Sequence, residues 1–260
     1  MASKQEIATV ANTAVSLLSD LDVFAEFAGA GFENVRANDM LVPRLAILQS
    51  LSPQLKKSKA SYIEGAQVGD IVDTGTGELM PQPTTFLPVY YRKDFIEWKP
   101  RNAGGGLVRV HPDDSILSQT RPNEKNKPVL PNGNEIIETA QLFGLNMTAG
   151  GRACFIAFSS TQLKKARRLL TLANGERIEV AGRQIQPPLF YRTYLLGTAE
   201  EAKQNDTWAG WTIERGPVLT ELPNWRDVMK VVTDFRASLQ RGEATADTSS
   251  LDAAAQEAPL

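Results

Sequence analysis

The sequence predicts an α+β protein: a curved antiparallel β-core, with peripheral N- and C-terminal helices and one basic helix packed on the sheet. Two observations favour this class. Short segments rich in β-branched and aromatic residues alternate with turns marked by Gly, Pro and Asn. Only three stretches have the apolar spacing that is typical of an amphipathic helix. An OB-like barrel is one form of such a core, but neither the number nor the spacing of the strands requires it.

Three regions follow one another along the chain. Helical spacing at residues 5–28, ended by Gly29 and Gly31, predicts that residues 1–31 form a peripheral helix docked on the body or on a neighbouring subunit. Residues 32–242 are expected to form a single α+β domain. Residues 243–260 hold four acids and neither basic nor aromatic residues, so we expect a disordered acidic tail.

The first half of the domain is expected to be mostly β. Pro43 marks the start or the edge of a strand at 45–49, and residues 68–80 predict a strand, a turn and a return. Residues 84–101 are long enough for one strand or a strand with a bend, and three glycines then indicate a hairpin to a strand at 107–110. Residues 112–134 show no period and predict a long excursion.

The second half mixes strands with two helices. Ser159–Thr161 would cap a helix at 162–173, and a last amphipathic helix is expected at 223–239. The other expected elements are strands at 135–146, 152–158, 176–180, 187–196 and 207–215, with a loop or short helical turn at 197–206.

Composition excludes several classes of protein. No apolar run approaches the ~18 residues of a membrane span, and the first residues lack a basic leader with an uninterrupted apolar core, so we expect a cytoplasmic protein without a secretory signal. The single cysteine, Cys154, permits neither an intrachain disulfide nor a Cys-based zinc site. No phosphate-loop, dinucleotide or zinc-protease motif occurs, and His111 with its neighbouring acids is typical of a polar turn. We therefore expect no enzyme activity, no cofactor and no metal.

Charge is unevenly distributed, although the net charge is only −2. Residues 84–216 hold 18 basic and 13 acidic side chains, whereas the segments before and after them are acidic. A basic middle can concentrate positive potential on one surface of a nearly neutral molecule.

The stretch TTFLPVYYRKDFIEWKPR, residues 84–101, combines aromatic rings with cations. The period of a strand places Leu87, Val89 and Tyr91 on one face, and Phe86, Tyr90, Arg92 and Trp98 on the other. Rings beside cations suit single-stranded nucleic acid, because rings stack on bases and cations contact phosphates. Packing explains aromatic residues in strands equally well.

Two further segments have similar chemistry. On the helix at 162–173, four cations fan over one side with no acid among them, which an anionic partner explains better than a solvated face does. The run FYRTY at 190–194 repeats the mixture of rings and cations. Trp208 and Trp211 fall on opposite faces of an extended strand, so at most one of them is expected to stack on bases.

A bacteriophage family, the single-stranded-DNA-binding proteins of podophages, is resembled by the segments LVPRLAILQSLSPQL, GDIVDTGTGEL, FLPVYYRKDFIEWKPR, FSSTQLKKARRL, FYRTYLL and TWAGWTIERG. That family includes cofactors of a phage-encoded RNA polymerase. The resemblance covers residues 40–216 and implies a preference for single strands, a fold unlike standard OB proteins, and recruitment of a polymerase or replication proteins. The acidic tail is similar in kind to tails with which other single-strand binders contact their partners.

We predict a non-enzymatic, sequence-tolerant single-stranded-DNA-binding protein that supports phage replication or transcription and forms a homo-oligomer, with no membrane partner. The residues expected to stack on bases or contact phosphates are Tyr90, Tyr91, Arg92, Lys93, Trp98, Lys99, Arg101, Arg152, Lys164, Lys165, Arg167, Arg168, Tyr191 and Arg192.

Two other classes stay open. One is a structural or assembly protein that uses the rings to contact its own copies and has no nucleic-acid role. The other is a metal-dependent nuclease that uses the scattered carboxylates.

Overall fold

The computed structural model describes residues 41–247 except 125, 204 and 205, and a few residues between 27 and 39. The predicted N-terminal helix and most of the predicted tail lie outside the described residues. Contacts divide the chain into two units, Met1–Met40 and Leu41–Leu260, and the second holds all the elements below. Within the described part, no helix is long and apolar enough to cross a membrane.

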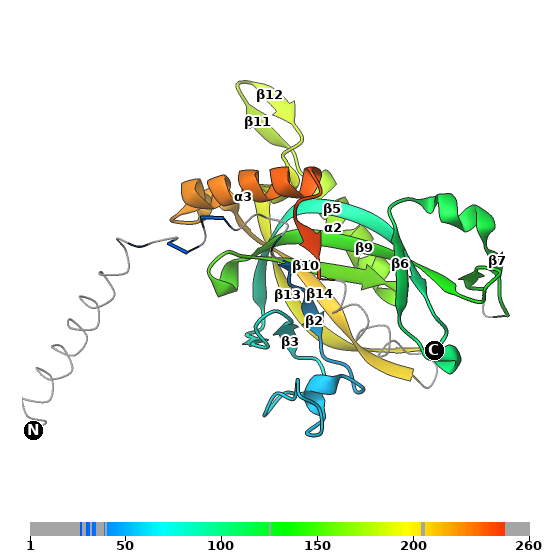
Figure 1. Ribbon diagram of the computed structural model, residues 1–260. Coiled ribbons are helices and arrows are strands. Elements are labelled where there is room, and N and C mark those ends of the chain that lie inside the picture. Colours follow the sequence, from blue (N-terminus) through cyan, green and yellow to red (C-terminus); the bar gives the residue numbers. More distant parts are fainter. Residues whose placement is uncertain are drawn as a thin grey trace, which may run out of the picture. The chain divides into compact units, whose positions relative to one another are not determined.

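The second unit is built on an eight-stranded sheet whose pairings are all antiparallel (Figure 1). Its main path runs β14–β13–β5–β9–β8–β7, while β10 also pairs with β9 and β6 also pairs with β5. The strands are β5 (Thr84–Trp98), β6 (Leu107–His111), β7 (Arg121–Pro122), β8 (Pro128–Val129), β9 (Glu135–Asn146), β10 (Arg152–Ser159), β13 (Arg192–Lys203) and β14 (Asp206–Val218). The predicted α+β class with a curved antiparallel core is confirmed.

Strand β5 organises the sheet because it is paired along both edges. Strand β9 pairs with one edge from Phe86 to Trp98. On the other edge, β13 pairs with the first three residues and β6 with the last four. A register shift between Pro88 and Tyr90 marks a bulge, which fits a proline that cannot donate to the ladder.

This bulge overturns the predicted alternation along β5. Phe86 and Tyr91 pack in one core cluster, whereas Leu87 and Val89 pack in another. An extra residue in one strand shifts every later side chain to the opposite face. The prediction that Tyr91 shares a face with Leu87 and Val89 is therefore wrong.

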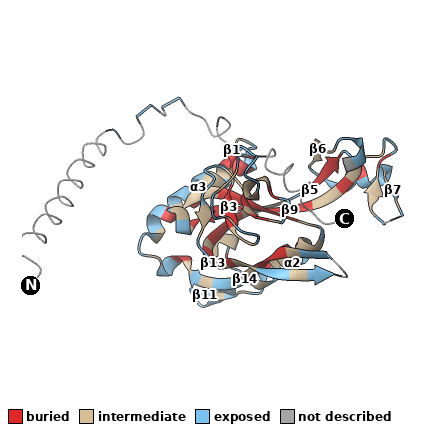
Figure 2. Ribbon diagram, turned by 90° about the horizontal axis from the view of Figure 1, so that it is seen from below, coloured by how far each residue is buried: buried red, intermediate tan, exposed pale blue. Residues whose placement is uncertain are grey.

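Two helices cover opposite faces of β5. Helix α2 (Leu163–Asn174) buries Ala166 and Leu169 in the cluster that contains Phe86. Helix α3 (Trp225–Gln240) buries Val228 and Val232 in the cluster that contains Leu87 and Val89. Both helices lie within two residues of their predicted bounds. Figure 2 shows the buried residues gathered where the strands of the main sheet and the helices pack together.

Three small sheets complete the unit. Strands β2 (Leu45–Ile47), β3 (Ile71–Asp73) and β4 (Leu79–Met80) form an antiparallel sheet. The hairpin of β11 (Ile178–Val180) and β12 (Arg183–Ile185) projects from the body (Figure 1). Strands β1 (Leu41–Val42) and β15 (Thr245–Ala246) pair in parallel.

Three local predictions are wrong. Residues 197–206, expected as a loop or helical turn, lie mostly in β13 and β14. Their residue types have low strand propensity, but the backbone hydrogen bonds between the two strands compensate for it. Residues 243–247, expected as tail, include β15, and Ala244 and Ala246 are buried. Tyr191, expected in a strand, ends a 3-10 turn at Leu189–Tyr191.

The predicted excursion at 112–134 contains a 3-10 turn at Asp114–Gln119 together with β7 and β8.

Candidate nucleic-acid interface

Helix α2 directs a row of cations to solvent because its buried residues lie on the opposite side. Lys164, Arg167 and Arg168 are exposed, whereas Ala166 and Leu169 are buried. The helix itself contains no acidic residue. Neighbouring like charges destabilise a helix by a few tenths of a kcal/mol per pair, so the balancing acids must come from other elements.

Glu138 of β9 is the first of these acids. Its Oε1 lies 2.9 Å from Nζ of Lys93 and 3.8 Å from Nη2 of Arg167. The hydrogen bond with Glu138 raises the pKa of Lys93. Strand β5 and helix α2 therefore each place one cation beside the same carboxylate.

Glu201 of β13 is the second acid, at the start of the helix. It lies 2.7 Å from Nζ of Lys165 and 4.0 Å from Nζ of Lys164. Gln162 and the indole N–H of Trp208 also donate to it, at 2.9 and 3.0 Å. Burial alone would raise the pKa of Glu201, but the hydrogen bonds from Lys165, Gln162 and Trp208 outweigh it and lower the pKa.

Glu176, just beyond the end of the helix, is the third. Nε of Arg192 lies 2.7 Å from it and Nε of Arg215 lies 3.5 Å from it. Arg215 also donates to the carbonyl oxygen of Leu172 at 3.1 Å, in the last turn of α2. A cation at this end of a helix is stabilised by the negative end of the helix dipole.

The α2 surface, as we define it, is formed by seven cations around the helix. They are Lys93, Lys164, Lys165, Arg167, Arg168, Arg192 and Arg215. Three carboxylates each contact two of these cations, and Arg168 has no ion pair within the described residues. Seven positive and three negative groups leave an excess of four positive charges.

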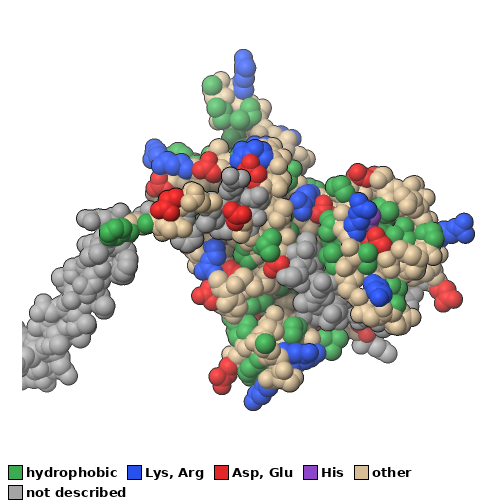
Figure 3. All heavy atoms as spheres, viewed as in Figure 1, with side chains coloured by type: hydrophobic (Ala, Val, Ile, Leu, Met, Phe, Trp, Pro, Cys, Tyr) green, Lys and Arg blue, Asp and Glu red, His purple; other side chains and the backbone are tan. Residues whose placement is uncertain are grey.

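Cations elsewhere are arranged differently. Helix α2 lies behind β9 in Figure 1, and on the near face of the molecule Lys and Arg side chains are spread among other residues (Figure 3). On the α2 surface, by contrast, the cations lie in pairs that share a carboxylate.

Several of the other predicted site residues pack into the core or onto the sheet. Trp98 is 8% exposed in a core cluster, and Tyr90 packs against the clusters on the α3 side. Arg92 donates to Asp94 and Gln141 and lies over the ring of Phe143. All three side chains therefore contribute contacts within the sheet. For the two aromatic residues this is the packing role that was the alternative to base stacking.

Three predicted residues are closer to solvent. Tyr91 is half-buried against the cluster under α2, and Tyr191 is half-buried in its turn. Lys99 is exposed at the β5–β6 connection, and the side chain of Arg101 lies outside the described residues.

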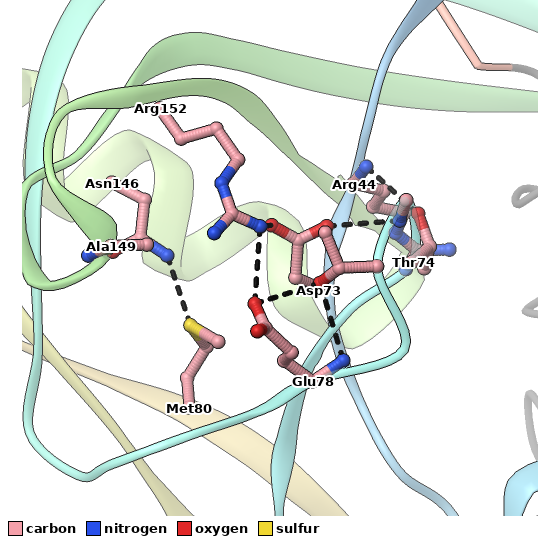
Figure 4. A network of polar contacts seen from close by, with 10 residues as sticks. Arg44, Asp73, Thr74, Glu78, Met80, Asn146, Ala149 and Arg152 are labelled. Atoms are coloured by element: carbon pink, nitrogen blue, oxygen red, sulfur yellow. Dashed lines mark hydrogen bonds and ion pairs between the residues drawn. The ribbon is translucent and has the colours of Figure 1, made fainter. Parts of the chain in front are cut away.

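Arg152 has a structural environment (Figure 4). Its Nη1 lies 3.4 Å from buried Asp73 and 3.2 Å from Glu78, next to the hydrogen bond from Asn146 to Met80. The network joins the β2–β3–β4 sheet to β9 and β10. Arg152 is thus engaged by two carboxylates of its own.

Sequence reasoning missed Trp208 and Arg215 as parts of the site. Trp211 is 3% exposed in the core, whereas Trp208 is half-buried with its indole on Glu201. The three-residue spacing of the two tryptophans indicated that at most one was available for stacking. Arg215 had no signal in the sequence, because its place beside α2 depends on the pairing of β13 with β14.

Comparison with known proteins places the chain in a family. The model of the Pam3 phage gp34-like protein matches residues 12–245, which include every helix and nearly every strand described above. The chain belongs to the Pam3 phage gp34-like family. It is therefore a phage protein, as the resemblance implied. No curated protein and no solved structure matches this gp34-like chain.

Proposed function

We propose that this gp34-like protein binds single-stranded DNA without sequence preference, and that the α2 surface contacts the phosphates. The sharing of three carboxylates among six cations supports the proposal most strongly. Each shared carboxylate leaves positive charge that a DNA phosphate can neutralise, with release of counterions.

Rings at the edges of the surface favour single strands. Tyr91 is two residues from Lys93 on β5, and Trp208 contacts the acid that binds Lys165. Stacking on an aromatic ring contributes about 1–3 kcal/mol per base and requires unpaired bases. Because Trp98 is buried, stacking depends on fewer rings than the sequence predicted.

In this proposal the protein has no catalytic role. It acts in the host cytoplasm, holds opened strands during phage replication or transcription, and recruits the phage RNA polymerase or replication proteins. Self-association would place several α2 surfaces along one strand.

The test is binding of a labelled oligonucleotide and of a matched duplex over a salt series. We expect tighter binding of the single strand and a steep fall of affinity with salt. The double variant R167A/R168A should flatten the slope of log K against log salt by about 1.4, since each single-strand phosphate contact contributes ~0.7.

The matched control is K230A/R236A, which removes two exposed cations from α3. It should leave the slope unchanged. Absence of binding at low salt, or equal effects of the two double variants, would show that the α2 surface does not bind DNA.

A further inference from the structure

A hollow of about 460 Å³ lies directly beside the α2 surface. It opens between the last two turns of α2 and the segment that follows β12. The residues that line it are Leu170, Thr171, Ala173, Asn174, Gln186, Pro187 and Leu189. Its volume lies within the range of small-molecule sites, roughly 300–1,000 Å³.

The hollow lies on the same side of helix α2 as the cations Arg167 and Arg168. Thr171 lies one turn beyond Arg167, and its hydroxyl donates to the carbonyl oxygen of Arg167 at 2.8 Å. Residues four apart lie on the same side of a helix. A group seated in the hollow would therefore have Arg167 and Arg168 within one helical turn.

The walls are apolar and the rim is polar. Ala173 and Leu189 pack against the main core cluster, and Pro187 is buried, so this part of the hollow is firmly supported. Thr171, Asn174 and Gln186 are exposed at its edge. Apolar walls with a few placed polar groups are typical of sites for flat, partly polar ligands.

Asn174 and Gln186 form an amide pair at this rim. Nε2 of Gln186 donates to Oδ1 of Asn174 at 2.7 Å. Within the described residues, this leaves the amide nitrogen of Asn174 and the amide oxygen of Gln186 with no hydrogen bond. If both amides were flipped, one donor and one acceptor would still remain. The base-pairing edge of a nucleobase presents the complementary donors and acceptors.

We propose that this hollow binds one unpaired base of the DNA strand held on the α2 surface. The base lies against the apolar walls and hydrogen-bonds with Asn174 and Gln186, while Arg167 and Arg168 contact its flanking phosphates. This inference rests on the proposed function and adds a physical reason for strand selection. A base in a duplex is stacked, and its pairing edge is occupied, so it cannot enter.

The experiment is a double-mutant cycle. It removes the bases of the oligonucleotide and the two rim amides of the protein, separately and together. Affinities are measured for an ordinary oligonucleotide and for one of equal length in which every position is abasic. Each is tested with the wild-type protein, with N174A/Q186A, and with the control N224A/Q240A, which removes two exposed amides of the α3 region.

The rim variant should bind the ordinary oligonucleotide about tenfold more weakly, within the range of one base contact. The same variant should bind the abasic strand as tightly as wild type, because the two changes remove one shared interaction. The control should match wild type with both strands. Thermal unfolding checks that each variant is folded.

An equal loss with both strands, or no loss with either, would overturn the base-binding hollow while leaving phosphate binding intact. If the wild-type protein binds neither strand at low salt, the proposed function itself fails, and the hollow as a base site fails with it.

Discussion

At the scale of single residues, Glu97 shows how a buried charge is held in the part of the sheet built by β5, β6 and β8. It is 7% exposed, accepts from Asn134 at 2.6 Å and from Asn132 at 3.4 Å, and lies 3.1 Å from Nε2 of His111. The hydrogen bond from Asn134, joined by those from His111 and Asn132, lowers the pKa of Glu97 despite its burial. The acids next to His111 in the sequence had indicated a polar turn. The approach of His111 to Glu97 was not predictable, because it depends on the pairing of β5 with β6.

Replacing Glu97 by glutamine should destabilise the protein in a pH-dependent manner. Because the folded pKa is lowered, the ionised carboxylate stabilises the fold above its unfolded value of ~4.3, and this contribution is lost as pH falls through the folded pKa. We expect E97Q to cost about 1–3 kcal/mol at pH 7. Its difference from wild type should shrink in acid.

Urea denaturation across this pH range measures the effect, with E124Q as an exposed control. A difference from wild type that stayed constant down to the lowest pH at which the protein folds would contradict the assignment.

At the scale of elements, the long or strongly periodic segments were predictable and the short pairings were not. Helices α2 and α3 follow from the period of their apolar residues, whereas strands β5 and β9 follow from the length of segments rich in β-branched and aromatic residues. The bulge after Pro88 was not predictable, because a period assumes an uninterrupted strand, and it redistributes Tyr90 and Tyr91 between two cores. The cationic face of α2 was predicted, whereas two of its three shared acids, Glu138 and Glu201, come from distant strands that only the folded sheet brings together.

Strand β15 belongs to the folded unit, although composition suggested a tail. Ala246 is 5% exposed and pairs with Val42, whereas its neighbour Thr245 is exposed. A246D places a charge in an apolar site and should cost about 2 kcal/mol or more.

T245D introduces the same side chain one residue earlier and should change stability by less than about 0.5 kcal/mol. Thermal unfolding of both variants distinguishes β15 from a tail, since equal stabilities of the two variants would mean that β15 contributes nothing.

At the scale of the whole second unit, the buried residues of β5 and β9 fall into four clusters. One lies under α2 and two lie on the α3 side, and one of these two includes Ile96 and Trp98. The smallest contains Phe95, Ile116, Leu130 and Ile136, where β6 and β7 lie (Figure 1). Loss of a residue from the smallest cluster should therefore leave the cluster under α2 intact.

The variant F95A tests this separation. Loss of a buried phenylalanine typically costs ~3–5 kcal/mol. We expect faster amide hydrogen exchange at residues 107–130 with little change in α2. V108A, an exposed change in the same region, should have no such effect. Equally faster exchange at residues 107–130 and in α2 would show one cooperative core instead.

In the proposed DNA complex, the shared carboxylates have a kinetic consequence. Since Glu138, Glu176 and Glu201 already neutralise part of the charge around α2, each phosphate would share a pair of cations with a carboxylate. The same acids would compete for the cations whenever a nucleotide dissociates. A strand held in this way would exchange rapidly from contact to contact, so an advancing polymerase could displace the protein without first unfolding it.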